Sequence, residues 1–151
     1  MGPARWWATG SVVPMLTFLT PEWIEALDEA ARRDPSLEAA TAPVDLVVEQ
    51  CVTDPAGDVT FHIVFDHGHV SVIPGPATAP TVRFSQDRET ALAIAAGVDS
   101  AQRAFMSGRL RVGGDLRVLL DHQVALSALD DVFASVRART DLSASGRGAR
   151  A

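Results

Sequence analysis

The chain has 151 residues, a length that suits one domain with a hydrophobic core. Its net charge of −6 excludes a general basic surface for nucleic acid, and its one cysteine, Cys51, excludes both an intramolecular disulfide and a cysteine-ligated zinc site. No run approaches the roughly 18 apolar residues of a membrane span, so stable membrane insertion is not expected.

The two ends differ from the middle, and we expect residues 1–18 and 140–151 to be tails around one domain, 19–139. The first 14 residues differ in composition from the rest of the chain, and Met15 is an alternative start. Adjacent tryptophans at positions 6 and 7 argue against a featureless tail, because they could bind a groove or a membrane surface. The residues after 140 lack apolar periodicity and are expected to be disordered.

The first predicted helix begins after Thr20, a good cap, with Pro21 at its first position. Leu19 and Ile24 occupy the two positions of a hydrophobic staple. The Asp34-Pro35 pair ends this helix, and we expect a loop through residues 42–43.

Four strands are predicted next, because β-branched and apolar residues alternate with polar ones between turn signals. They cover Val44–Thr53, Val59–Phe65, Val70–Ile73 and Thr81–Ser85. Their short connections favour an antiparallel meander.

The rest of the chain is predicted to be mainly helical. A helix capped by Ser85 or Asp87 ends at Gly97, and a second helix, capped by Asp99, ends at Gly108. A fifth strand over 109–112 is broken by the glycines at 113 and 114, and a helix capped by Asp115 follows it. The last helix covers 122–139, with the acidic pair 130–131 facing away from its apolar stripe. This order predicts an α+β fold: a five-stranded, mostly antiparallel sheet covered on one face by helices.

The search for chemistry is mostly negative. No phosphate-cradling glycine loop, G-x-S-x-G nucleophile elbow or nucleophile–base pair is visible, so we expect no enzyme, no catalytic residue and no cofactor. His67 and His69 have a metal-like spacing, but no third ligand is predictable and a solvated hairpin is favoured, so no metal is expected. Arg109 and Arg111 share the polar side of one strand, where either a small anion or phospholipid head group binds or the face is simply solubilising.

A longer motif runs from Ala104 to Leu116 as A-F-M-x-G-R-L-x-V-x-G-D-L, preceded by S-x-D-x-E-T over Ser85–Thr90. It resembles the sterol carrier protein 2 domain family, and the resemblance covers about residues 19–136. It implies a five-stranded sheet with helices over one face that enclose an apolar tunnel. Members of that family bind fatty acids, acyl-coenzyme A, sterols or phospholipids, and no catalytic residue is implied.

The resemblance also implies which side chains lie near the tunnel. Motif positions, positions on the preceding strand and helix, and the apolar stripe of the last helix together give the expected cavity lining. These residues are Phe84, Leu92, Phe105, Met106, Leu110, Val112, Leu116, Leu129 and Phe133. The chain lacks the peroxisomal ending of eukaryotic members, so a cytoplasmic, bacterial protein is expected.

The expected function is therefore non-enzymatic binding, with transfer, of an apolar lipid such as a fatty acid, an acyl-coenzyme A or a sterol-like molecule. Mobility of the last helix would gate entry. The alternative is an accessory or interaction subunit with a filled core that acts with an enzyme of lipid metabolism. A homodimer or a partner enzyme is left open in either case.

Overall fold

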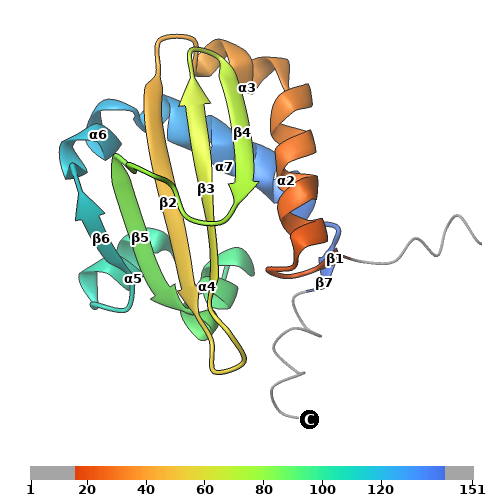
Figure 1. Cartoon of the computed structure of the whole chain (residues 1–151), viewed down its shortest axis with the longest axis vertical. Coiled ribbons are helices and arrows are strands. Elements are labelled where there is room, and N and C mark those ends of the chain that lie inside the picture. Colours follow the sequence, from red (N-terminus) through yellow and green to blue (C-terminus); the bar gives the residue numbers. More distant parts are fainter. Residues whose placement is uncertain (1–15, 142–151) are drawn as a thin grey trace, which may run out of the picture.

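The computed structural model describes residues 16–141 as one five-stranded sheet with helices on one face (Figure 1). The strand order is β4-β3-β2-β5-β6, and a separate two-stranded pair joins β1 and β7. The strands are β1 Leu16–Thr17, β2 Asp45–Thr53, β3 Val59–Asp66, β4 His69–Pro74, β5 Val82–Asp87, β6 Arg111–Gly114 and β7 Thr140–Asp141. The helices are α2 Pro21–Arg33, α3 Pro35–Ala40, α4 Arg88–Ala95, α5 Ala101–Met106, α6 Leu116–Asp121 and α7 Gln123–Arg137. The predicted α+β class with its mostly antiparallel sheet is confirmed.

Helix α2 begins and ends as predicted, but a second helix, α3, which was not predicted, follows it directly. The hydroxyl of Thr20 accepts a hydrogen bond from the backbone N–H of Trp23 (3.3 Å), which caps α2. The carboxylate of Asp34 accepts one from the N–H of Leu37 (3.0 Å) and so caps α3. Pro35 ends one helix and fits the first position of the next, because that position needs no N–H donor. The element order predicted from the sequence did not include α3, whereas the loop predicted through residues 42–43 is present between α3 and β2.

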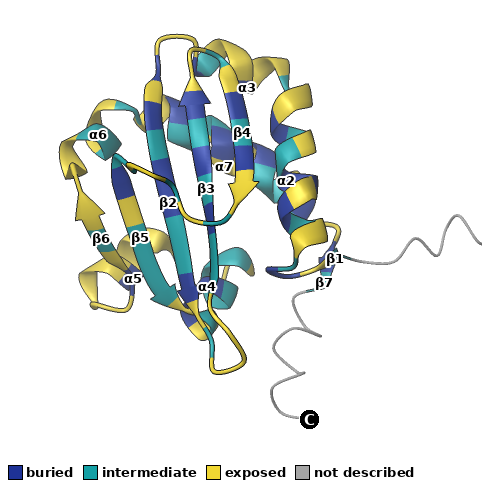
Figure 2. Ribbon diagram, viewed as in Figure 1, coloured by how far each residue is buried: buried dark blue, intermediate teal, exposed yellow. Residues whose placement is uncertain are grey.

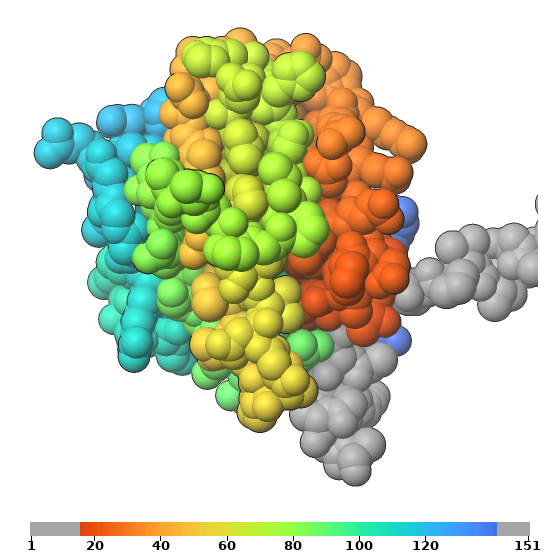
Figure 3. All heavy atoms as spheres, viewed as in Figure 1, coloured from red at the N-terminus to blue at the C-terminus, as the bar shows by residue number. Residues whose placement is uncertain are grey.

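The sheet is a meander only over its first three strands. Strands β2, β3 and β4 pair antiparallel as predicted, but β5 pairs in parallel with β2, with Val82 beside Val48. The linker between β4 and β5 crosses the outer face of the sheet, where Figure 3 shows it in green. The expected antiparallel return of the fourth strand was wrong, because this proline-rich linker is long enough to pass over β3 and β2.

A buried carboxylate on the outer face holds this linker in place. Glu49 is 6% exposed; its Oε1 accepts a hydrogen bond from the N–H of Ala77 and its Oε2 accepts one from Nε of Arg83, both at 2.9 Å. The ring Nδ1 of His62 lies 2.8 Å from the carbonyl oxygen of Gly75. These contacts satisfy a charge that would be costly to bury alone, and they fix β5 beside β2.

Helix α2 covers the free edge of β4. The carboxylate of Asp28 accepts a hydrogen bond from the N–H of Val72 (2.8 Å) and pairs with Arg32 (3.0 Å). An edge strand otherwise presents unpaired backbone groups to other chains, so this contact closes that side of the sheet.

The core lies between the inner face of the sheet and helices α2, α3 and α7 (Figure 2). Phe65, Leu27 and Leu37 are among its largest fully buried side chains. The apolar stripe predicted for the last helix is buried, namely Ala125, Leu129, Val132 and Val136.

The segment from 98 to 121 keeps its predicted order of helix, strand and helix, with two corrections. Ser100, not Asp99, caps α5, because its hydroxyl accepts from the N–H of Arg103 (3.0 Å). The strand lies two residues later than predicted and includes both glycines, with Gly114 opposite Val82. The physical reason is that the N–H groups of residues 109 and 110 both donate to the carbonyl oxygen of residue 104, which keeps them out of the ladder.

Ordered structure reaches slightly beyond 19–139 at each end. Leu16 and Thr17 pair in parallel with Thr140 and Asp141, so these four residues belong to the fold. The tryptophan pair at 6–7 and the alternative start at Met15 lie outside the described residues. Within residues 16–141, no helix is both long enough and apolar enough to cross a membrane.

Candidate ligand-binding cavity

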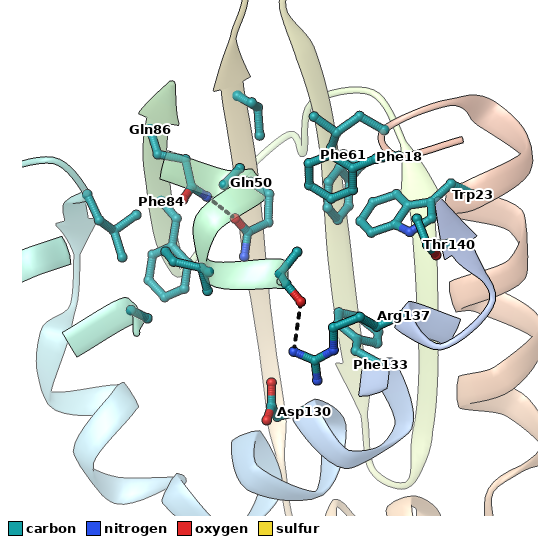
Figure 4. Close-up of a pocket in the computed structure, with 17 residues that line it drawn as sticks. Phe18, Trp23, Gln50, Phe61, Phe84, Gln86, Asp130, Phe133, Arg137 and Thr140 are labelled. Carbon is teal, nitrogen blue, oxygen red and sulfur yellow. Dashed lines mark hydrogen bonds between the residues drawn. The ribbon is translucent and has the colours of Figure 1, made fainter. Parts of the chain in front are cut away.

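A cavity of about 190 Å³ lies between the inner face of the sheet and helices α4 and α7 (Figure 4). Strands β2, β3 and β5 form one wall, α4 and α7 form the opposite wall, and the segment around β1 and α2 closes one end. The lining is mostly apolar, with a few polar side chains at defined places, which is the usual character of a site for a small apolar molecule.

Three aromatic rings form one end of the cavity. The rings of Phe18 and Trp23 lie 5.0 Å apart and those of Trp23 and Phe61 lie 5.8 Å apart, both edge to face. Figure 4 shows these three rings together at the side nearest α2. Edge-to-face packing fixes each ring, so this end presents a rigid apolar surface.

Two glutamines interrupt the apolar wall that the sheet provides. Gln50 follows Leu46 and Val48 on the inner face of β2, and Gln86 follows Phe84 on the inner face of β5. Nε2 of Gln86 donates to Oε1 of Gln50 (3.3 Å), as Figure 4 shows, while Oε1 of Gln86 is buried without a hydrogen-bond partner. An amide atom left unpaired in this way costs about 1–3 kcal/mol, so the cavity contains an unused polar group.

Helix α7 contributes three residues to the other side of the cavity: Asp130, Phe133 and Arg137. Nη1 of Arg137 donates to the carbonyl oxygen of Ala95, the last residue of α4, at 3.2 Å. Asp130 is exposed, as predicted for the acidic pair, yet it borders the cavity instead of facing away from it. The two charged groups stand on one face of α7, seven residues apart, which corresponds to about 10.5 Å along the axis.

Of the residues expected to line a cavity, Phe84, Leu110 and Phe133 do so. Three others lie outside this lining in the body of the protein: Leu129 is in the core, and Leu92 and Val112 are half-buried.

The remaining three expected residues lie on the outside of α5 and α6. Phe105 is 44% exposed, Met106 78% and Leu116 43%, and none borders the cavity. The reason is the short length of α5, which buries only Ala104 and turns the following two side chains outward. Ligand contact by Phe105, Met106 and Leu116 stays a prediction that this geometry does not support.

Sequence reasoning missed the aromatic end, the two glutamines and Arg137. A signal for the glutamines was present, because each occupies an inward position in an alternating strand. A signal for Trp23 was also present in the apolar stripe of α2, but that stripe fits an ordinary core equally well.

Two carboxylates that precede helices α4 and α5 have lowered pKa values for structural reasons. Hydrogen bonds from the side chain and backbone of Thr90 lower the pKa of Asp87, which caps α4. The backbone N–H of Ser100, together with Arg109 and Arg103, lowers the pKa of Asp99. Both carboxylates therefore stabilise helix starts and turns, and neither is poised as an acid or base at neutral pH.

The other polar groups singled out in the sequence stand apart from the cavity. His67 and His69 are exposed in the hairpin between β3 and β4, and Nδ1 of His67 lies 3.1 Å from Oδ1 of Asp66. Arg109 pairs with Asp99, whereas Arg111 is exposed on β6. In the part of the chain that the structure describes, no group of three or more His, Cys, Asp or Glu side chains could hold a metal ion.

A sheet with helices over one face and a mostly apolar cavity between them defines the class of small α+β domains with an internal ligand site. The model of the SCP-2 sterol transfer family matches residues 25–127, and the chain belongs to this family. No curated protein matches the chain.

Solved structures agree with this fold. A conserved hypothetical protein from Thermus thermophilus superposes with a TM-score of 0.66 at 19% identity, over 82% of this chain and 92% of that one. A crystal structure of sterol carrier protein 2 gives a TM-score of 0.64 at 19% identity, over 78% and 97% of the two chains. The sterol carrier protein domain 2 of Helicoverpa armigera gives 0.57 at 20% identity, over 76% and 87%.

Proposed function

We propose that this protein binds an apolar lipid in the cavity between the sheet and helices α4 and α7, and transfers it without catalysing a reaction. A fatty acid, an acyl-coenzyme A or a sterol-like molecule fits the proposal. The observation that carries it is a mostly apolar cavity of about 190 Å³ inside a fold of the SCP-2 sterol transfer family.

Apolar burial supports binding at this place. The cavity is lined mostly by apolar side chains, so an apolar ligand that enters it buries its own surface at about 25 cal/mol per Å².

The size of the cavity also bears on how a ligand enters. A cavity of about 150 Å³ holds a benzene-sized molecule, so this cavity takes an apolar segment only somewhat larger than that. A whole long acyl chain or a sterol needs more room. We expect α7 to move away from α4 on binding, which breaks the contact between Arg137 and Ala95.

Native mass spectrometry of the purified protein, followed by organic extraction, tests the proposal. The expected result is a co-purifying lipid mass that disappears on extraction, together with saturable binding of a neutral fluorescent alkyl probe. The proposal is overturned if the protein carries no lipid and the probe does not bind.

One observation favours a second candidate, an accessory subunit that docks on another protein or on its own copy. Of the seven large hydrophobic residues that are exposed within residues 16–141, six fall between positions 98 and 124. These six are Val98, Phe105, Met106, Leu116, Leu120 and Val124. Where such exposed residues form a contiguous apolar patch, the patch is typical of an interaction surface. Light scattering after size exclusion would detect a homodimer, and a monomer that binds lipid would favour the first candidate.

A further inference from the structure

Arg137 is the cationic side chain of the cavity. Among the described residues that line it, no other carries a positive charge. Figure 4 shows the guanidinium reaching across from α7 towards the carbonyl oxygen of Ala95 at the end of α4. Its side chain is half-buried and lies on the same helix face as Phe133.

Within residues 16–141 this guanidinium has no acidic partner, unlike that of Arg88, the other described arginine that is not exposed. No carboxylate of residues 16–141 lies within 4.0 Å of Arg137, whereas Arg88, also half-buried, pairs with Asp54 at 3.1 Å. The other described arginines without such a partner are all exposed to water: Arg33, Arg111, Arg117 and Arg139.

The carbonyl oxygen of Ala95 leaves most hydrogen-bond donors of the Arg137 guanidinium unused. A guanidinium has five N–H donors, and the bond to Ala95 at 3.2 Å engages one of them. The carbonyl of Ala95 lies at the negative end of the α4 dipole, which stabilises the cation only weakly. A half-buried guanidinium is better satisfied by a carboxylate or a phosphate, which accepts two parallel hydrogen bonds.

We propose that Arg137 binds the anionic head of the ligand, a carboxylate or a phosphate, while the apolar chain lies in the cavity. The inference rests on the proposed lipid-binding function and names the class of lipid. Asp130 strengthens the preference for one orientation of an anionic lipid. Its negative charge lies on the same face of α7 and repels the head group from the Asp130 end of the cavity, which leaves Arg137 as the favourable position.

Competition against a neutral fluorescent alkyl probe tests this inference. The competitors are palmitate, hexadecyl phosphate, hexadecanol and methyl palmitate, which share a chain length and differ in the head. The proteins are the unaltered chain, Arg137→Gln, Arg137→Lys and the matched control Arg139→Gln, which removes an exposed arginine two residues away. Circular dichroism and thermal melting confirm that each variant is folded.

We expect the unaltered protein to bind palmitate at least about tenfold more tightly than hexadecanol, since a hydrogen bond between two charged groups is stronger than one to a neutral hydroxyl. Arg137→Gln should abolish this preference, because it should weaken palmitate at least about tenfold more than hexadecanol. Arg137→Lys should keep part of it, and Arg139→Gln should keep all of it. Comparison of palmitate with hexadecyl phosphate distinguishes a carboxylate head from a phosphate head. The compound whose head binds Arg137 should lose more affinity in Arg137→Gln.

Three results would overturn the inference, and they are distinguishable. If the probe binds but palmitate and hexadecanol compete equally in the unaltered protein, the lipid-binding function stands and the role of Arg137 fails. If Arg137→Gln weakens palmitate and hexadecanol alike, Arg137 only links α7 to α4. If the probe does not bind at all, the proposed function itself fails.

Discussion

Replacing Ala91 by leucine is expected to fill part of the cavity, stabilise the ligand-free protein and weaken lipid binding. Ala91 is a buried residue of α4, and its small side chain borders the cavity. Leucine is a strong helix former, so the change does not disturb the helix itself. The added carbons would occupy space that the lipid chain otherwise takes.

The magnitude depends on the volume available. Three added carbons, buried at about 0.8 kcal/mol each, give an upper limit of about 2.4 kcal/mol in the free energy of unfolding. Imperfect fit in a packed neighbourhood reduces this gain, and about 1 kcal/mol is a realistic value. For a chain of this length, that gain corresponds to a rise of about 3–5 °C in the melting temperature.

Two measurements check the prediction on the same samples. Differential scanning calorimetry of delipidated protein gives the melting temperature, and titration with the neutral alkyl probe gives the dissociation constant, which we expect to rise at least about tenfold. Ala96→Leu is the matched control, because Ala96 follows directly on α4 but is exposed and does not border the cavity. It should change neither quantity appreciably.

The reasoning is refuted if Ala91→Leu binds the probe as tightly as the unaltered protein, because the lipid then occupies another place. A destabilised variant that still binds less lipid would mean that the cavity is too narrow for leucine. In that case Phe84→Leu, which enlarges the same cavity, should bind the probe at least as tightly as the unaltered chain, and weaker binding would refute the site.

Three further predictions concern the fold and the cavity wall. Gly114→Ala should destabilise the protein by about 2–4 kcal/mol, because this residue has a φ of +92° and a Cβ there would overlap a backbone carbonyl. Gly113→Ala, with open space around it, should change stability by less than about 1 kcal/mol, and equal losses in urea denaturation would contradict this. Hydrogen bonds at the start of α4 lower the pKa of Asp87, so its contribution to stability is complete above its ordinary pKa and is lost as the pH falls below about 4. Asp87→Asn should therefore flatten the acid side of the stability profile, and an unchanged profile would exclude this role. Gln50→Leu should cost about 1–2 kcal/mol because it leaves the whole amide of Gln86 unpaired, whereas the double change of both glutamines to leucine should recover most of that loss in a double-mutant cycle.

The start of helix α2 and the strands β2 and β3 could be predicted, because the residues that specify them lie close together in the sequence. The cap and the proline at 20–21 are adjacent in the sequence, and the alternation in β2 and β3 is read within a few residues. The parallel placement of β5 could not be predicted in this way. It depends on Glu49, which meets Ala77 and Arg83 28 and 34 residues later, and no periodicity reports such a contact.

The family resemblance implied the expected lining of the candidate site, and three of its residues, Phe84, Leu110 and Phe133, line the cavity. For Phe84 and Phe133, strand alternation and the apolar stripe of a long helix also fix the direction of the side chain. Phe18 was placed in a tail, because its position depends on pairing between the two ends of the chain. Phe105 and Met106 carry the family motif, but a motif identifies a fold and does not decide which way a six-residue helix turns its side chains.

The cavity and the two inward glutamines argue together for a binding site. Each reduces stability on its own, since an unfilled cavity loses packing and the unpaired oxygen of Gln86 loses a hydrogen bond. A core selected for stability alone would place apolar side chains at positions 50 and 86, as it does at Val48 and Val82 on the same strand faces. Both costs fall at one cavity, which is also lined by the guanidinium of Arg137, a group with no acidic partner among the described residues. Local departures from optimal packing that coincide in this way are expected where a protein keeps space and polar groups for a ligand.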